Sequence, residues 1–589
     1  MKHRCFKFTL VLLAAFFSIS LNGKVVTQQK AMEFATRFFA NNAESRSNMV
    51  SMKLAWDSNQ LPLKARSSVD DSPAFFVFTP SDGEGFVIVA GDDVSVPVLG
   101  YSFENRMPSV DKLPQNLHSW LEVAHEGIVR ARKKGKLATS SIEQKWVESR
   151  AGDLLVMLKT PSWGQDNPYN LQCPMDGNKY SKVGCTTVAI ATVMGYYEWP
   201  KAGRGTTKAY TTSTRGIRVD ARNLEHQYGW DNMKMEYISG SYNDEEANAV
   251  ATLMADIAIA IEADFTEEST SAFAKIDALY NHFDYHPGMY RVDREDYGLE
   301  DWSQLMRDEL MKNRPVWYRG NDAYNNSSHA FVLDGCTTDG YFHINWGWSG
   351  YCDGYFYLDA LYPADDDYSY DQSAILNMIP NDGTPIEDRL VVHNEGLESN
   401  TDEYLSYLPF GMTACVLNNN SIMEYDGILR LAVTDFQGSV KEWICDEKKC
   451  ENLKPNYYRS AISFQCTIKG DIVIGDRIRL FHKPNDSEQW SLVTSKGSNV
   501  PWEILITDEY TISESTSVSF DKESGILIVT FKDDVAATIS CNGQPVAVGI
   551  AYNLNSLEVE TKKLPDGVYT IKLEKGLDMK EFSFEVKPL

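Results

Sequence analysis

Residues 183–197 have the sequence VGCTTVAIATVMGYY, a glycine-bearing turn followed by a small-residue and apolar run that Pro200 closes. The run is long enough for three helical turns and predicts a buried helix that begins at Cys185. A thiol at a helix N-terminus lies beside unpaired N–H groups and the positive end of the helix dipole, which favour the thiolate. Cys185 is therefore a candidate nucleophile, and a buried structural cysteine is the alternative.

A histidine about 140 residues later is the candidate partner of this thiol. Residues 327–335, SSHAFVLDG, place His329 where a polar loop enters an apolar strand, and residues 341–350, YFHINWGWSG, follow after a turn. The pattern predicts an antiparallel hairpin that brings Asn345 back beside His329. An imidazole that acts as a base needs an acceptor for its other nitrogen, and the Asn345 side-chain carbonyl can serve.

Two further side chains complete the predicted site. Trp346 follows Asn345 and can shield the Asn345–His329 hydrogen bond from water. Gln165 lies 20 residues before Cys185, and its amide can donate to a developing oxyanion alongside the Cys185 backbone N–H.

These stretches resemble the streptopain-like cysteine peptidases, a branch of the papain-like enzymes. The resemblance covers roughly residues 150–380, and its segments are residues 163–170, 184–189, 328–335 and 342–348. By position it implies Cys185 as nucleophile and His329 as base. It further implies Gln165 as oxyanion donor, with Asn345 and Trp346 as orienting residues. A papain-like catalytic fold and an inhibitory propeptide are also implied.

Other candidate residues have weaker patterns. His343 alternates with apolar neighbours and is interpreted as a strand histidine with satisfied hydrogen bonds. His282 and His286 have i,i+4 spacing but lack the carboxylate of a zinc motif. Cys445 and Cys450 favour a local disulfide or two free thiols over zinc. The acidic run 365–367 is interpreted as a solvated loop. No cofactor and no metal site are expected.

Composition restricts partners and location. The net charge of −26 argues against nucleic acid, whose phosphates it would repel. Residues 1–23 combine a basic start with a short apolar run, which predicts a cleaved signal peptide and a secreted or surface-exposed bacterial protein. No later run is long enough for a membrane span. Nine of the ten cysteines remain after residue 23, an odd number that suits one free catalytic thiol.

The 589 residues are divided by pattern into an α+β chain of several domains. A propeptide is predicted over residues 24–140, with a helix from Gln28 to Asn41 whose buried face carries Met32, Ala35, Phe38 and Phe39. It ends in an exposed basic linker, Arg130–Lys136, where cutting is expected. The later ranges predicted are 141–381 for the two-lobed papain-like peptidase domain, 382–506 for a β-sandwich-like module and 507–589 for a C-terminal β-sandwich or sorting module.

The sequence therefore predicts a secreted cysteine endopeptidase made as a zymogen, with protein or peptide substrates and its own propeptide as inhibitor. The alternative is an adhesin or host-protein-binding protein with a catalytically silent peptidase-like domain, and intact candidate residues argue against it. A Cys-His acyltransferase such as a transglutaminase is a second alternative, which the local motifs do not fit.

Overall fold

The computed structural model describes residues 24–42, 51–62, 72–322, 327–358, 372–384, 390–401, 404, 409–435, 437–455, 457–470, 472–473, 475–506, 517–521, 526–530, 536–541, 544–545, 550–553, 556–565, 567–575 and 578–586. The predicted signal peptide and the acidic run 365–367 lie outside the described residues. In the described part of the chain, no helix is long and apolar enough to cross a membrane.

The N-terminal domain is a helix on an antiparallel sheet. Helix α1 (Gln28–Asn42) buries Phe34, Phe38 and Phe39 against one face of strands β1 (Met52–Asp57), β2 (Phe75–Pro80), β3 (Phe86–Ala90) and β4 (Val98–Ser102). The predicted helix is confirmed, although Met32 is only partly buried. Its apolar residues recur every three to four positions, so they form one stripe that the sheet covers.

Helix α2 (Gln115–Lys133) carries the basic run that the sequence suggested as an exposed linker. The side chain of Arg132 is only 9% exposed and is paired with the fully buried carboxylate of Asp92 at 2.8 Å. Three backbone carbonyls accept its other N–H groups, so the guanidinium is satisfied inside the domain. The exposed-linker prediction is therefore wrong for Arg132. Helix α3 (Ser140–Val147) and the exposed segment after it form the connection to the peptidase domain.

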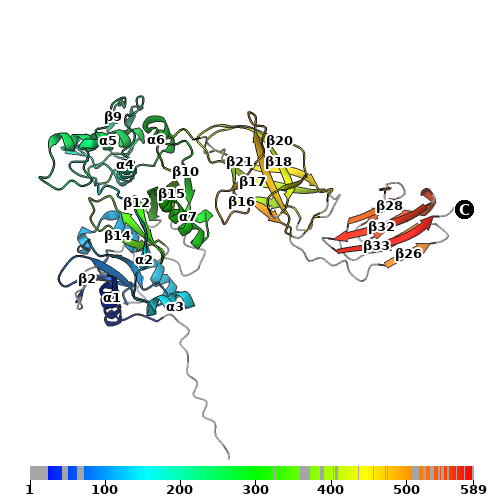
Figure 1. The fold of residues 1–589 in the computed structure, drawn as a ribbon, viewed down its shortest axis with the longest axis horizontal. Helices are drawn as coiled ribbons and strands as arrows, with labels where there is room; N and C mark the ends of the chain where they lie inside the picture. Colours follow the sequence, from blue (N-terminus) through cyan, green and yellow to red (C-terminus); the bar gives the residue numbers. More distant parts are fainter. Residues whose placement is uncertain are drawn as a thin grey trace, which may run out of the picture.

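One sheet runs through both the N-terminal domain and the peptidase domain. It contains eleven strands in the order β1-β2-β3-β4-β14-β13-β12-β11-β15-β10, with β5 paired to β12. Strand β4 joins β14 through the pairs Tyr101–Tyr355 and Gly100–Phe356. The peptidase strands are β5 (Leu154–Met157), β10 (Tyr290–Asp293), β11 (Val316–Asp322), β12 (Ser327–Thr337), β13 (Tyr341–Asn345), β14 (Gly354–Tyr357) and β15 (Gln372–Leu376). The predicted β12–β13 hairpin is confirmed. In Figure 1 the blue β2 and the green β14 belong to one continuous layer.

Helices cover both faces of the peptidase part of this sheet. Helices α4 (Cys185–Tyr197), α5 (Asp244–Ala260) and α6 (Ile276–Phe283) form the helical lobe, whose core includes Ala330 and Val332 of β12. Asn243 and Glu246 form a capping box at the start of α5. Helices α2 and α7 (Leu299–Met311) pack against the other face, where Phe331 and Leu333 of β12 are buried.

Short elements fill the connections. They are β6 (Met175–Asp176), β7 (Lys179–Tyr180), β8 (Tyr210–Thr211), β9 (Arg218–Val219) and the 3-10 turns η1 (Ser58–Gln60), η2 (Val110–Lys112), η3 (Trp230–Asn232), η4 (Arg294–Asp296) and η5 (Thr561–Lys563).

Two β modules follow the peptidase domain, as predicted (Figure 1). In the first, one sheet contains β16 (Leu390–Ser399), β17 (Pro409–Asn419), β21 (Tyr458–Thr467) and β24 (Thr494–Ser495). The facing sheet contains β18 (Tyr425–Thr434), β19 (Val440–Trp443), β20 (Lys448–Leu453), β22 (Arg477–Pro484), β23 (Ser491–Leu492) and β25 (Glu503–Leu505). Both sheets contribute to one apolar core, as in a β-sandwich.

The second β module also has two four-stranded sheets. One contains β26 (Ser517–Asp521), β27 (Ile526–Thr530), β30 (Ile550–Asn553) and β31 (Ser556–Glu560). The other contains β28 (Ala536–Cys541), β29 (Gln544–Pro545), β32 (Gly567–Lys575) and β33 (Asp578–Val586).

Candidate active site

Cys185 begins helix α4, as the sequence predicts. The preceding Gly184 has φ +91°, and a Cβ there would lie 2.8 Å from the Thr270 carbonyl oxygen. A glycine is required at this position because both the backbone conformation and the close approach exclude a side chain. Apart from its first and last turns, α4 is fully buried, so the helix holds the thiol rigidly at the surface of the helical lobe.

The thiol lies against the start of strand β12. The Ala330 N–H donates to the Cys185 sulfur at 3.4 Å, and the Ser328 carbonyl oxygen lies 4.0 Å from it. These two residues flank His329, which is 8% exposed. The fold therefore brings the backbone of the candidate base to the candidate nucleophile from 144 positions away in the chain.

The side chains of β12 alternate between two cores. Pairing of β12 with β11 is regular from Ser327 to Leu333, so side chains alternate between the two faces there. Ala330 and Val332 enter the core of the helical lobe, whereas Phe331 enters the core beneath α2 and α7. Alternation gives His329 the same side of the strand as Phe331, while the sulfur contacts backbone groups at the strand edge. Among the described residues, the hydrogen-bond partners of the sulfur outside its own helix are backbone groups of β12.

Burial decides the ionisation of the thiol in this arrangement. Desolvation raises the pKa of Cys185, although the amides of Ala330, Thr186 and Cys185 itself act to lower it. The expectation that the helix N-terminus would favour the thiolate is therefore not met here, because removal from water outweighs those amides. The thiol is protonated at neutral pH in this form.

Gln165 lies in the segment that leads to the nucleophile. Its backbone carbonyl accepts from the Val183 N–H at 3.1 Å, two residues before Cys185, and the residue is 9% exposed. The neighbouring Trp163 carbonyl accepts from the Ser349 N–H at 3.0 Å, which ties this segment to the end of the β13 hairpin. The structure thus places Gln165 near the Cys185 turn.

Asn345 has partners other than the predicted histidine. Its side-chain N–H₂ donates to the Pro161 carbonyl at 3.0 Å and to the Thr160 hydroxyl at 3.1 Å. Its side-chain oxygen accepts from the Gly347 N–H at 3.1 Å. Both N–H donors of the amide are therefore engaged, and the expected Asn345–His329 hydrogen bond is not among the contacts of Asn345 in this structure.

Trp346 is fully buried beneath α2. Its ring lies 4.9 Å from that of Phe331 and 5.0 Å from that of Phe356, measured between centroids. Asn116, at the start of α2, donates from its side chain to the Trp346 carbonyl at 2.6 Å. A residue of the N-terminal domain thus contacts the strand end that carries the predicted orienting residues.

A polar network that sequence reasoning missed lies behind Asn345. His343 pairs with Asp334 at 2.6 Å, and Thr160 donates to the other oxygen of Asp334 at 2.5 Å. Burial alone would lower the pKa of His343, but the Asp334 carboxylate outweighs it and raises that pKa. Burial raises the pKa of Asp353 to about 7, and that carboxyl accepts from the Trp346 N–H. His343 was interpreted as a satisfied strand histidine, which is confirmed, but nothing in the local pattern identified Asp334 as its partner.

Residues 101–105 of the N-terminal domain contact the catalytic sheet at β14. Tyr101 stacks on Tyr355 with centroids 5.3 Å apart, and Asn105 donates to the Asp353 carbonyl at 2.8 Å. These contacts lie at the β4–β14 junction rather than at the sulfur of Cys185.

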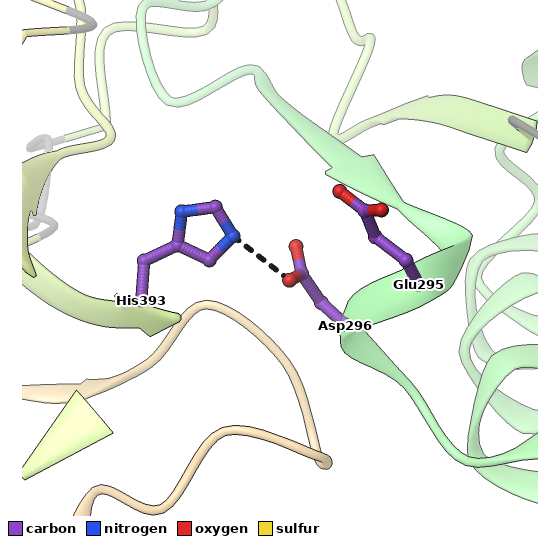
Figure 2. A group of neighbouring side chains, drawn as sticks. All are labelled: Glu295, Asp296 and His393. Atoms are coloured by element: carbon purple, nitrogen blue, oxygen red, sulfur yellow. Dashed lines mark hydrogen bonds and ion pairs between the residues drawn. The ribbon is translucent and has the colours of Figure 1, made fainter. Parts of the chain in front are cut away.

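Metal-ligand groups gather at one place in the described part of the chain. Glu295 and Asp296 of η4 meet His393 of β16, with potential ligand atoms within 4.8 Å of one another (Figure 2). However, the Lys496 ammonium lies 3.3 Å from Asp296 and 2.7 Å from Asp293. Burial acts to lower the pKa of Lys496, but these carboxylates raise it. The Lys496 ammonium thus supplies the positive charge that a metal ion would bring to this cluster.

We therefore assign this cluster to the interface between the peptidase domain and the first β module. The Asn499 N–H donates to the Asp296 carbonyl at 2.8 Å, and a Cβ at Gly497 would lie 2.2 Å from the same carbonyl oxygen. His282 and His286, the other candidate pair, bind different groups. His282 contacts the Arg204 carbonyl and His286 contacts Thr384, so they do not form a joint site.

Comparisons with known proteins match two families to this chain. The family described as "Peptidase C10 family" matches residues 163–356, and the family described as "Spi protease inhibitor" matches residues 23–128. The first match contains the five predicted site residues, and the second contains α1, the four N-terminal strands and most of α2. The arrangement is that of a cysteine peptidase with a propeptide-like inhibitor domain.

Streptopain of Streptococcus pyogenes is 33% identical over 311 residues, which cover 49% of this chain and 75% of streptopain. The chain belongs to the peptidase C10 family. The thiol protease/hemagglutinin PrtT of Porphyromonas gingivalis is 29% identical over 374 residues, 60% of this chain and 42% of that protein. A prointerpain A fragment of Prevotella intermedia is 29% identical, with a TM-score of 0.45 over 53% of this chain and 96% of the fragment.

Proposed function

We propose that this chain is an exported cysteine endopeptidase made as a zymogen, in which Cys185 is the nucleophile and His329 the general base. The observation that carries the proposal is the position of the Cys185 sulfur, 3.4 Å from the Ala330 N–H on the strand that presents His329. Protein or peptide chains are the substrates, and the N-terminal domain is the inhibitor. The domain limits 24–140, 141–381, 382–506 and 507–589 are part of the proposal.

In the active form, the Cys185 thiolate attacks a peptide carbonyl carbon, and electrons move onto the carbonyl oxygen. The Cys185 N–H and the Gln165 side chain stabilise this oxyanion. His329 gives a proton to the leaving amine, which leaves a thioester on Cys185. Water, deprotonated by His329, then hydrolyses the thioester and releases the acid and the thiol.

The described form has features of a latent enzyme. The Cys185 sulfur contacts the backbone of β12, the Asn345 N–H₂ is engaged with Thr160 and Pro161, and burial raises the pKa of the thiol. Activity requires the His329 imidazole to reach the Cys185 sulfur and to donate from its other nitrogen to the Asn345 side-chain oxygen. Trp346, which contacts the N-terminal domain through Asn116, is placed to change with them.

The test compares the intact chain with a Cys185→Ala variant on a denatured protein substrate. The intact protein should mature and digest the substrate, and iodoacetamide should stop the digestion. The variant should remain at full precursor length and leave the substrate intact. Retained digestion by Cys185→Ala, or inactivation through alkylation of a different cysteine, would refute the assignment of the nucleophile.

A second measurement tests the inhibitor role separately. Residues 24–140, expressed alone, should inhibit the mature enzyme when added in trans. A folded fragment without effect, together with a fully active precursor, would make the N-terminal domain a binding domain. Export is tested by whether the host removes residues 1–23 and releases the remainder.

A further inference from the structure

Two cysteines outside the peptidase site share the core of the first β module. Cys445 follows β19 and is 9% exposed, and Cys466 near the end of β21 is fully buried. The two thiols come from opposite sheets of the sandwich, because β19 and β21 belong to different sheets. A covalent link between them would therefore join the sheets.

A backbone hydrogen bond brings the two segments together. The Thr467 N–H donates to the Ile444 carbonyl at 2.8 Å, so the backbone next to Cys466 contacts the backbone next to Cys445. A disulfide spans Cα atoms roughly 4.4–6.8 Å apart, a separation that neighbouring hydrogen-bonded segments provide. The two thiols are also close enough to influence each other's ionisation.

The surroundings of Cys445 make its sulfur the more nucleophilic of the two. The Leu431 N–H donates to this sulfur at 3.2 Å. The thiol of Cys466, the Leu431 amide and the Arg430 guanidinium lower the pKa of Cys445 despite its burial. The same thiol–thiol contact raises the pKa of Cys466. These contacts favour the thiolate at Cys445 over a thiolate at Cys466.

We propose that Cys445 and Cys466 form a disulfide bond that joins the two sheets of the first β module. The Cys445 thiolate attacks one sulfur of a small disulfide oxidant, forms a mixed disulfide and releases one thiolate. Cys466 then loses its proton and attacks the Cys445 sulfur, which expels the second thiolate. The two cysteines lose two electrons and two protons in total, and the oxidant is reduced to two thiols.

Cys450 provides the competing pairing and a matched control. It is also buried in this module, but it lies on β20 opposite Gly427 of β18, within a single sheet. Burial raises the pKa of its thiol. The sequence leaves a local Cys445–Cys450 bond open as an alternative. Such a bond would close a short loop between β19 and β20 and leave the two sheets unlinked.

Peptide mapping distinguishes these pairings. The full chain carrying Cys185→Ala, which removes the proposed nucleophile, is exposed to oxidised glutathione, alkylated under denaturing conditions and digested with trypsin. Cleavage after lysine and arginine, but not before Pro455, separates the three cysteines into residues 442–448, 450–459 and 460–469. We expect residues 442–448 linked to residues 460–469, with Cys450 alkylated.

Thermal unfolding supplies a second readout, because packing alone would not make the melting temperature respond to dithiothreitol. After oxidation, the β-module transition of the Cys466→Ala chain should lie roughly 10 °C below that of its parent, since closing a loop of this size restricts the unfolded state. Dithiothreitol should reduce the gap. The Cys450→Ala chain should keep the full response to dithiothreitol.

Two results would overturn the proposal. One is a link between residues 442–448 and 450–459 in place of the expected one. The other is recovery of all three peptides as alkylated thiols after exposure to the oxidant, with no response of the melting temperature to dithiothreitol.

Discussion

Arg132 holds the end of α2 to the N-terminal sheet, and its replacement should loosen that domain selectively. In Arg132→Met the aliphatic volume is largely kept, while the ion pair with Asp92 and three hydrogen bonds to the Ser72, Pro73 and Gly91 carbonyls are lost. Asp92 is fully buried and keeps only its contact with the Val94 N–H among the interactions described here. An uncompensated buried charge typically costs about 3–5 kcal/mol.

Arg150 is the matched control. It lies 3.9 Å from Asp153, and both side chains are more than three-quarters exposed. A solvent-exposed pair at this distance contributes roughly 0–1 kcal/mol. Arg150→Met should therefore leave the N-terminal domain almost unchanged. Arg132→Lys keeps the charge but loses the planar fork, so its effect should lie between the two.

Hydrogen exchange measured by mass spectrometry is a suitable assay, because it reports opening region by region. In a Cys185→Ala background, peptides from β3, β4 and the end of α2 should exchange roughly 100- to 5000-fold faster in Arg132→Met, given about 1.4 kcal/mol for each factor of ten. With Cys185 intact, the same variant should mature faster. Equal exchange in Arg132→Met and Arg150→Met would refute the argument from buried charge.

Three further expectations concern the pH response, the catalytic machinery and the cut. Burial lowers the pKa of His482 to about 4 from 6.5, so between these pH values the unfolded module binds one more proton than the folded module. The free energy of unfolding, measured by urea titration, should therefore fall by about 3 kcal/mol from pH 6.5 to pH 4. In His482→Phe it should depend less on pH. In the mature enzyme, Asn345→Ala should lower kcat more than it raises KM, as measured by steady-state kinetics. A raised KM with an unchanged kcat would contradict this prediction. Sequencing of the new N-terminus should show that the maturation cleavage falls within residues 134–153, because α2 and β5 on either side are hydrogen-bonded into the fold. A first cleavage inside α2 would contradict this prediction.

Local patterns in the sequence predicted the elements that local physics determines. The apolar run after Gly184 became α4 with the thiol at its first residue, and the two apolar segments around residues 338–340 became the β12–β13 hairpin. Cys185 and His329 were also placed on adjoining elements. For the helix and the hairpin, the periodicity, a turn residue or a helix start is contained within about 20 residues of chain.

What the sequence did not predict depends on long-range pairing. Nothing local to Tyr101 or Tyr355 specifies that β4 and β14 join two domains into one sheet, because any exposed strand edge offers the same backbone groups. The face occupied by His329 follows from strand register, and a shift of one residue would reverse it. The partners of Asn345 and Arg132 come from segments that are distant in sequence. The composition of the basic run suggested that it is exposed. It could not reveal that Arg132 pairs with the buried carboxylate of Asp92 in another part of the chain.

The strand pair β4–β14 has a consequence for what a cut in the connecting segment achieves. After the cut, β4 is still hydrogen-bonded to β14, and Trp120 of α2 still packs against Phe356. The inhibitor is then held without a covalent tether, so its retention obeys mass action and no longer benefits from a high effective concentration. Cleavage creates a non-covalent complex, and the dissociated fraction of this complex increases as the sample is diluted. A concentrated sample of cut protein stays inhibited, and the same sample becomes active when it is diluted below the dissociation constant of that complex.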